Sequence, residues 1–197
     1  PVDPGDKVLD VCAAPGGKSI HAADLLAGTG MVEARDITEK KAALIEENVY
    51  RCGFSNIRTK VWDALVPDES VKAKADVVLA DLPCSGLGIM GRKNDIKYHL
   101  TADQLDELVK LQRKILATAW RYVKPGGTLI FSTCTLNQQE NVENVRWIEE
   151  NTPLQPVSVE ECLPKDLRGR TGKEGYLQLL PGIDGCDGFF VAKFTRK

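Results

Sequence analysis

The feature that most constrains the fold is a regular alternation of short apolar runs with amphipathic segments. Lys7–Cys12 is a short apolar run of the kind found in strands buried on both faces, and a helix is expected from about Lys18 to Ala27. Thr38–Arg51 is amphipathic, with a stripe of apolar residues opposite its charges. Further strands are expected at Met31–Ile37, Ile57–Trp62, Asp76–Ala80 and Thr128–Ser132. This alternation predicts a mostly parallel α/β sheet with helices on both faces.

The second half of the chain contains residues typical of helix ends and of a β-hairpin. A long helix is expected to begin at Thr101, with Gln104 completing a capping box, and to be stopped by Pro125-Gly126-Gly127. Asn137 with Glu140 resembles another cap before a helix that runs to about Asn151. Tyr176–Leu180 and Phe189–Phe194, separated by a glycine-rich turn, predict a closing antiparallel hairpin and bring the expected strands to seven.

Composition narrows the function classes. The chain has 197 residues, 43% hydrophobic and 27% charged, which is typical of one globular domain and excludes a disordered chain. No apolar run is long enough to span a bilayer, so we expect a soluble cytoplasmic protein. The formal charge of -2 excludes a protein held to nucleic acid by bulk positive charge alone.

The six cysteines argue against both a disulfide framework and a metal site. None forms a C-x-x-C pair, and the two histidines, His21 and His99, are far apart in sequence, so no zinc site is expected. Free thiols in a reducing compartment are expected for Cys52, Cys162 and Cys186.

Ligands of parallel α/β sheets bind at the carboxyl ends of the strands. At the first such end, Ala14-Pro15-Gly16-Gly17-Lys18 forms a glycine-rich turn that opens a helix, but it matches neither G-x-G-x-x-G nor the nucleoside triphosphate loop. Asp36 ends the second strand, where a carboxylate can bind a ribose diol, and Asp63 ends the third, beside the expected adenine position. Together they predict a pocket for an adenosine-containing cofactor, which fits both S-adenosylmethionine (SAM) and NAD.

Two thiols follow the next strand ends. Asp81-Leu82-Pro83-Cys84-Ser85-Gly86 places a carboxylate and a thiol on a proline-stiffened loop, and Ser132-Thr133-Cys134-Thr135 provides a second thiol. A single buried cysteine is usually inert packing. Two thiols at adjacent strand ends, near Asp81 and with Lys18 opposite, indicate nucleophilic catalysis by a thiolate.

Four segments of the chain resemble the Sun/Fmu-type RNA cytosine-5 methyltransferases, with the bacterial small-subunit (16S) rRNA enzymes as the most similar group. They are Asp10–Lys18, Asp81–Gly86, Ser132–Thr135 and Asp187–Lys193, and the resemblance covers essentially the whole chain. It implies a Rossmann-like class I SAM-dependent methyltransferase fold, with residues 1–197 as the catalytic domain and without the RNA-binding region that precedes it in full-length relatives.

The resemblance also implies roles for individual residues. The methionine end of SAM would be held by Cys12, Ala13, Ala14, Pro15, Gly16, Gly17 and Lys18. Asp36 would bind the ribose hydroxyls and Asp63 the adenine. Asp81 would border both the methyl donor and the target base, and Lys18 would contact the same base. Cys134 would be the nucleophile, and Cys84 would help to release the product.

The implied partner is RNA, with small-subunit rRNA favoured, and we expect a monomer with no metal. The loop Met90–His99 would line an RNA channel, with phosphates contacted by Arg92, Lys93 and Lys97. Arg168–Lys173 is a weaker candidate of the same kind. The alternatives are a tRNA cytosine-5 methyltransferase, an NAD-dependent Rossmann oxidoreductase, and a non-catalytic binding module on the same scaffold.

Overall fold

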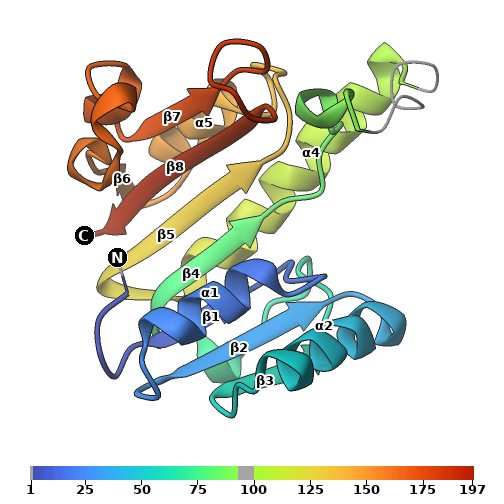
Figure 1. The fold of residues 1–197 in the computed structure, drawn as a ribbon, viewed down its shortest axis with the longest axis vertical. Coiled ribbons are helices and arrows are strands. Elements are labelled where there is room, and N and C mark those ends of the chain that lie inside the picture. The colour runs from blue at the N-terminus through green and yellow to red at the C-terminus, as the bar shows by residue number, and fades with distance from the viewer. Residues whose placement is uncertain (1, 93–99) are drawn as a thin grey trace. The chain divides into compact units, whose positions relative to one another are not determined.

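The computed structural model describes residues 2–92 and 100–197, which form two compact units. Unit 1 contains the chain up to Asp81 together with Thr118–Leu129 and Arg196. Unit 2 contains Leu82–Ala117, Ile130–Thr195 and Lys197. Figure 1 traces both units in the order of the sequence.

Unit 1 is a parallel sheet covered by two helices. Its elements are β1 (Lys7–Asp10), α1 (Gly17–Leu25), β2 (Met31–Asp36), α2 (Glu39–Cys52), β3 (Ile57–Val61), the 3-10 turn η1 (Glu69–Val71), β4 (Ala75–Asp81), η3 (Trp120–Tyr122) and the first part of β5 (Val123–Thr133). The strand order is β3-β2-β1-β4-β5, with β1 parallel to both β2 and β4, and β2 parallel to β3. Helices α1 and α2 pack on β1, β2 and β3 (Figure 1).

The two faces of strand β2 differ in chemistry. Ala34 packs with Ala13, Ile45 and Val49, because the apolar stripe of α2 lies on that face. The neighbouring residue, Arg35, points to the opposite face of the sheet, since successive side chains of a strand alternate. There it is fully buried and meets the ring of Tyr122 from η3.

Unit 2 is built around the C-terminal hairpin. Its elements are η2 (Leu87–Ile89), most of α4 (Ala102–Ala119), the end of β5, α5 (Val142–Asn151), β6 (Leu154–Pro156), η4 (Glu160–Cys162), η5 (Lys165–Leu167), η6 (Thr171–Glu174), β7 (Tyr176–Leu179) and β8 (Phe189–Arg196). The strand order continues β5-β8-β6, and β7 pairs antiparallel with β8. The predicted hairpin is therefore confirmed. All seven expected strands are present, and the three-residue β6 is an eighth.

Two predicted boundaries were wrong. Pro125-Gly126-Gly127 does not stop the long helix, because α4 ends at Ala119 and these residues lie inside β5. Helix α5 begins only at Val142, and Asn137 and Glu140 lie in the turn before it. The carboxylate of Glu140 is fully buried, so tertiary contacts decide its position and not helix capping. The Thr101–Gln104 capping box is present as predicted, with reciprocal hydrogen bonds of 3.0 and 3.3 Å.

Candidate active site

A pocket of about 280 Å³ lies at the carboxyl end of β1, within unit 1. It is lined by Asp10, Cys12, Ala13, Ala14, Pro15, Gly17, Lys18 and Asp81. The turn before α1 is tight because Gly16 adopts a φ of 104°, a left-handed conformation that favours glycine. Helix α1 begins at Gly17, and its first N–H groups have no partner within the helix. The predicted glycine-rich segment therefore forms one wall of a pocket at a helix N-terminus.

Gly17 shows that this wall has room for a ligand. A Cβ atom built at Gly17 would meet no atom of the described chain within 4 Å, and the φ of Gly17 lies outside the left-handed region. Neither backbone conformation nor protein packing requires glycine at this position. An open space beside helix N–H groups fits the carboxylate of an amino-acid moiety, since a helix N-terminus attracts anions.

Asp10 is a buried carboxyl group in the pocket wall that the sequence analysis did not assign. It is 1% exposed and accepts hydrogen bonds from the Ser19 hydroxyl at 2.7 Å and the Cys12 N–H at 3.4 Å. Burial raises the pKa of Asp10 to about 7, although the hydrogen bond from Ser19 acts in the opposite direction. A charged residue within an apolar strand was the available sequence signal.

Cys12 is unsuited to be a nucleophile in this environment. Burial raises the pKa of the Cys12 thiol well above its ordinary value, and the neighbouring carboxylates Asp10 and Asp36 raise it further. The Cys12 sulfur therefore remains a neutral thiol at physiological pH. Cys12 thus lines the pocket as an uncharged side chain.

Lys18 and Asp81 meet at the pocket. The Nζ atom of Lys18 lies 2.7 Å from Oδ2 of Asp81, and the two side chains are 42% and 32% exposed. One residue comes from the start of α1 and the other from the end of β4, so the fold brings together two predicted site residues that are 63 positions apart. Their charged ends remain accessible to a ligand.

Asp36 and Asp63 lie at the ends of neighbouring strands. The backbone N–H of Trp62 donates to the carbonyl of Asp36 at 2.9 Å, which joins the end of β2 to the segment after β3. The Asp36 carboxylate accepts from the Ala14 N–H at 2.9 Å and lies 3.0 Å from the Nζ of Lys41. Asp36 thus ties the glycine-rich turn to β2. Asp63 is half-buried and accepts from the N–H of Leu65 at 2.9 Å.

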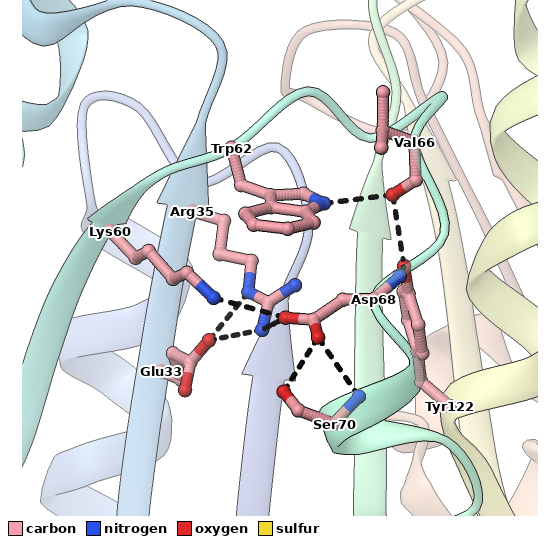
Figure 2. A network of polar contacts seen from close by, with 8 residues as sticks. All are labelled: Glu33, Arg35, Lys60, Trp62, Val66, Asp68, Ser70 and Tyr122. Carbon is pink, nitrogen blue, oxygen red and sulfur yellow. Dashed lines mark hydrogen bonds and ion pairs between the residues drawn. The ribbon is translucent and has the colours of Figure 1, made fainter.

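A buried ionic cluster fixes the segment that contains Asp63. Figure 2 shows the guanidinium of Arg35 between the carboxylates of Glu33 and Asp68, below the ring of Trp62. The Nη2 atom of Arg35 lies 2.9 Å from Oδ2 of Asp68, and Lys60 reaches the same oxygen at 3.0 Å. Trp62 donates its indole N–H to the carbonyl of Val66 at 2.8 Å. The segment Trp62–Asp68 is therefore held at both ends.

The two predicted thiols meet in unit 2. The Sγ atoms of Cys84 and Cys134 lie 3.2 Å apart, and the backbone N–H of Cys134 donates to the Cys84 sulfur at 3.3 Å. Both residues are partly exposed, and none of the six cysteines, all of which are described, forms a disulfide. The hydrogen bond with Cys134 and then burial raise the pKa of Cys84 well above its ordinary range. Cys84 therefore holds a proton beside the Cys134 sulfur.

The backbone of Cys134 is held by two glycines in close contact. The N–H of Gly88 donates to the carbonyl of Cys134 at 3.0 Å, and the N–H of Gly188 donates to the carbonyl of Gly88 at 2.8 Å. A Cβ atom at Gly88 would lie 2.3 Å from the Gly188 carbonyl oxygen and 2.8 Å from that of Cys134. Only glycine fits at position 88.

The basic residues predicted to contact RNA are described in part. Arg92 is 78% exposed and pairs with Asp187 at 2.8 Å, whereas Lys93 and Lys97 lie outside the described residues. Arg168 donates to the carbonyl of Leu163 at 2.9 Å, and Arg170 pairs with Asp184. The Arg168–Lys173 segment thus uses its two guanidinium groups within the fold. Over the described ranges, no helix is both long and apolar enough to cross a membrane, and no three metal-ligating side chains are grouped for an ion.

These features can be compared with known proteins. The model of the family described as 16S rRNA methyltransferase RsmB/F matches residues 1–195. The chain belongs to this family. A probable ribosomal RNA small subunit methyltransferase B of Bacillus subtilis (strain 168) is 40% identical over 195 residues, which are 98% of this chain and 43% of that protein.

Solved structures agree with the RsmB/F assignment. NSun6 from Pyrococcus horikoshii, solved with the SAM analogue SFG, has a TM-score of 0.83 and 29% identity, covering 97% of this chain and 48% of that one. A SAM-dependent methyltransferase from Aquifex aeolicus, at a TM-score of 0.60 and 15% identity, covers 98% of this chain and 84% of its own, and shows the shared fold alone. The RsmB/F chain thus has the Rossmann-like fold of SAM-dependent methyltransferases and SAM as its cofactor. It spans less than half the length of the B. subtilis and NSun6 proteins.

Proposed function

We propose that this chain is the catalytic domain of an enzyme that methylates carbon 5 of a cytosine in RNA, with small-subunit rRNA as the substrate. The observation that carries the proposal is the pair of thiols, Cys84 and Cys134, with sulfur atoms 3.2 Å apart. Methyl transfer to an oxygen or nitrogen atom needs no cysteine. Transfer to carbon 5 does, because that carbon is a poor nucleophile until a thiolate has added to the ring.

The first step belongs to Cys134. Its thiolate attacks carbon 6 of the cytosine and forms an S–C6 bond, and the electron pair of the C5–C6 double bond becomes available at carbon 5. Bound SAM supplies an electrophilic methyl group, which carbon 5 takes up. The target base has to leave its stack for this attack, as in other enzymes that modify nucleobases.

Cys84 suits the release step. After the methyl group is added, the proton on carbon 5 has to leave, and its electron pair restores the C5–C6 double bond while the S–C6 bond breaks. The pKa of Cys84 is raised first by its hydrogen bond with Cys134, then by burial, and also by the charge of Cys134. When Cys134 is bonded to the base, the hydrogen bond and the charge are removed. The pKa of Cys84 then falls, so Cys84 loses its own proton to solvent, and the resulting Cys84 thiolate accepts the carbon 5 proton.

Asp81 and Lys18 act on the base through charge. Asp81 and N3 of the cytosine share a proton taken from solvent when the base binds, which stabilises the negative charge that develops at N3 when the thiolate adds, and Lys18 contacts the same base. Their 2.7 Å ion pair orients both groups before the base arrives. The segment Cys12–Lys18 holds the methionine part of SAM, Asp36 the ribose and Asp63 the adenine.

Family membership excludes the alternative of an NAD-dependent oxidoreductase. The proposal includes a monomeric domain in the cytoplasm, with Arg92 at the RNA. Arg92 can exchange its partner Asp187 for an RNA phosphate, because both side chains of this ion pair are exposed to solvent.

The test supplies the chain with SAM labelled in its methyl group and, separately, with small-subunit rRNA and with tRNA. Nuclease digestion and mass spectrometry then identify the labelled nucleoside. The proposal predicts 5-methylcytidine from rRNA. Labelled nucleosides methylated on nitrogen or on ribose oxygen would contradict the chemistry, and label in tRNA alone would contradict the substrate.

A further inference from the structure

Behind the thiol pair lies a buried polar cluster centred on the carboxylate of Glu140, which the proposed mechanism does not use. Glu140 is 0% exposed. Oε2 accepts from the Ser85 backbone N–H at 2.9 Å and from Nε2 of Gln112 at 2.8 Å. Oε1 accepts from the hydroxyls of Ser85 and Thr135, at 2.5 and 3.3 Å, and from the Asn137 side chain at 3.2 Å.

The residues bound by Glu140 have a specific relation to the thiols. Ser85 directly follows Cys84, and Thr135 directly follows Cys134. The Ser85 and Thr135 hydroxyls also lie 2.6 Å from each other. One carboxylate therefore ties together the two loops that carry the cysteines, at the position adjacent to each sulfur.

Helix α4 anchors the carboxylate from the other side. Gln112 is 0% exposed and donates to the Pro83 carbonyl at 3.0 Å as well as to Glu140. Its Oε1 accepts from Asn144 of α5 at 2.8 Å. The cluster thus reaches the residue before Cys84 as well as the one after it, and two helices fix its position.

Stability alone does not account for such an arrangement. A buried carboxylate is expensive to desolvate, and apolar side chains of similar volume are often equally stabilising or more so. A fully hydrogen-bonded cluster does, however, fix geometry sharply, because each donor has one position relative to the acceptor. The geometry that the Glu140 cluster fixes is the separation between the sulfur atoms of Cys84 and Cys134.

We propose that Glu140 is a positioning residue that holds Cys84 and Cys134 at the separation required for adduct formation and release. This inference rests on the proposed cytosine-5 function for its catalytic consequence. The geometric part, that Glu140 sets the effective concentration of one thiol at the other, can be measured without RNA.

The substitution that tests this is Glu140→Gln, which keeps the shape but replaces one acceptor by an NH2 donor. If the NH2 group takes the place of Oε2, it faces the donors of Ser85 and Gln112. If it takes the place of Oε1, it faces the side-chain amide donor of Asn137. The matched control is Glu150→Gln, at an exposed position of helix α5, which follows Glu140 in the chain. Thr135→Val, which removes one hydroxyl of the cluster and nearly keeps its volume, is the second test if Glu140→Gln does not fold.

The first readout is the equilibrium of the thiol pair with glutathione. Two protein thiols and one oxidised glutathione give one Cys84–Cys134 disulfide and two reduced glutathione molecules, and mass spectrometry of digested peptides counts the disulfide. Glu140→Gln is expected to lower this equilibrium constant by at least about 10-fold, because the thiols no longer face each other. Glu150→Gln is expected to leave it unchanged.

The second readout is methyl transfer to RNA at saturating SAM. Glu140→Gln should lower the turnover number about 10- to 100-fold, the effect expected of a small misplacement of reacting groups, with the dissociation constant of SAM unchanged. A variant that only melts at a lower temperature, with both readouts as in the wild type, would overturn the inference. If the wild type itself methylates no RNA, the proposed function fails, while the glutathione equilibrium still decides whether Glu140 positions the thiols.

Discussion

The sulfur atoms of Cys84 and Cys134 lie 3.2 Å apart, and the backbone N–H of Cys134 also donates to the Cys84 sulfur. The two cysteines are 50 residues apart in sequence, yet each is the neighbour of the other's reacting atom. Under the proposed function the two thiols have separable roles, Cys134 in forming a covalent adduct and Cys84 in resolving it.

Cys84→Ser should therefore stop the reaction after adduct formation and not before it. Serine cannot take the carbon 5 proton at neutral pH, so the RNA is expected to stay bonded to Cys134. Denaturing gel electrophoresis with labelled RNA and SAM measures the adduct, and Cys186→Ser, at an exposed cysteine of unit 2, is the control. Turnover by Cys84→Ser at the wild-type rate would refute the release role.

Asp10 predicts a pH dependence of stability. Its pKa is about 7 in the folded protein against 3.8 ordinarily, so the folded state binds more protons between these values. The contribution of Asp10 to the free energy of unfolding is therefore fully present below pH 4 and decreases as the pH rises to about 7. The decrease is about 1.4 kcal/mol per pH unit and about 4 kcal/mol in all. Asp10→Asn should lack this loss.

The measurement for Asp10 is denaturant unfolding at pH 5 and pH 8. From pH 5 to pH 8, the free energy of unfolding of the wild type should fall relative to that of Asp10→Asn. Asp24→Asn, at an exposed position of α1, should show no such difference from the wild type. An equal change in the free energy of unfolding of Asp10→Asn and the wild type would mean that folding does not raise the pKa of Asp10.

The ionic cluster around Arg35 predicts a large effect of one substitution and a small effect of its neighbour. Asp68→Asn leaves a buried guanidinium short of a charge partner and should cost about 3–5 kcal/mol. Glu69→Gln breaks the pair with Arg121, in which the Glu69 side chain is 63% exposed, and should cost no more than about 1 kcal/mol. Equal losses of unfolding free energy would show that the cluster contributes no more than a surface pair.

Asp68 also predicts loss of stability in acid. Burial would raise the pKa of Asp68, but hydrogen bonds from Ser70 and Lys60 outweigh it and hold that pKa well below its ordinary value. A carboxyl group with a lowered pKa stabilises the fold above its unfolded pKa and loses this contribution as the pH falls below about 4. Wild type should therefore lose stability below pH 4 more steeply than Asp68→Asn.

The sequence predicted the strand ends, and with them most of the candidate site. Ala14–Lys18 and Asp81 in unit 1, and the two thiols in unit 2, each follow a strand with a clear apolar pattern. Thr38, the first residue of the predicted amphipathic segment, caps α2 by accepting a hydrogen bond from the backbone N–H of Lys41. Local patterns thus placed the ends of these elements, where the proposed site residues lie.

The groups that support the site could not be predicted in this way. Glu140 resembled a helix cap because local spacing allows that interpretation, and only the tertiary fold brings Ser85 and Gln112 to it. Pro125-Gly126-Gly127 resembled a helix stop for the same reason, but α4 had already ended at Ala119. A polar Gln112 within the apolar stripe of a helix was the one local hint of a buried network.

Substitutions at Gly88 and Gly91 test the close backbone contact at Cys134, with Gly91 as the control. Gly88→Ala places a Cβ within 3 Å of three backbone atoms and should cost about 1–3 kcal/mol, with slower methyl transfer because the Cys134 carbonyl shifts. Gly91→Ala meets no described atom within 4 Å and should stay within about 0.5 kcal/mol of the wild type. Thermal unfolding and turnover compare the two, and equal behaviour would contradict the close contact.

The proposed function depends on attack of the Cys134 thiolate on carbon 6 of a cytosine. RNA containing 5-fluorocytosine tests it most directly, because fluorine cannot leave carbon 5 as a proton does and the adduct is trapped. With SAM, we expect an RNA–protein complex that survives denaturation, maps to Cys134 and is abolished by Cys134→Ala. A trapped complex of equal yield in Cys134→Ala, or one that maps to Cys84, would contradict it.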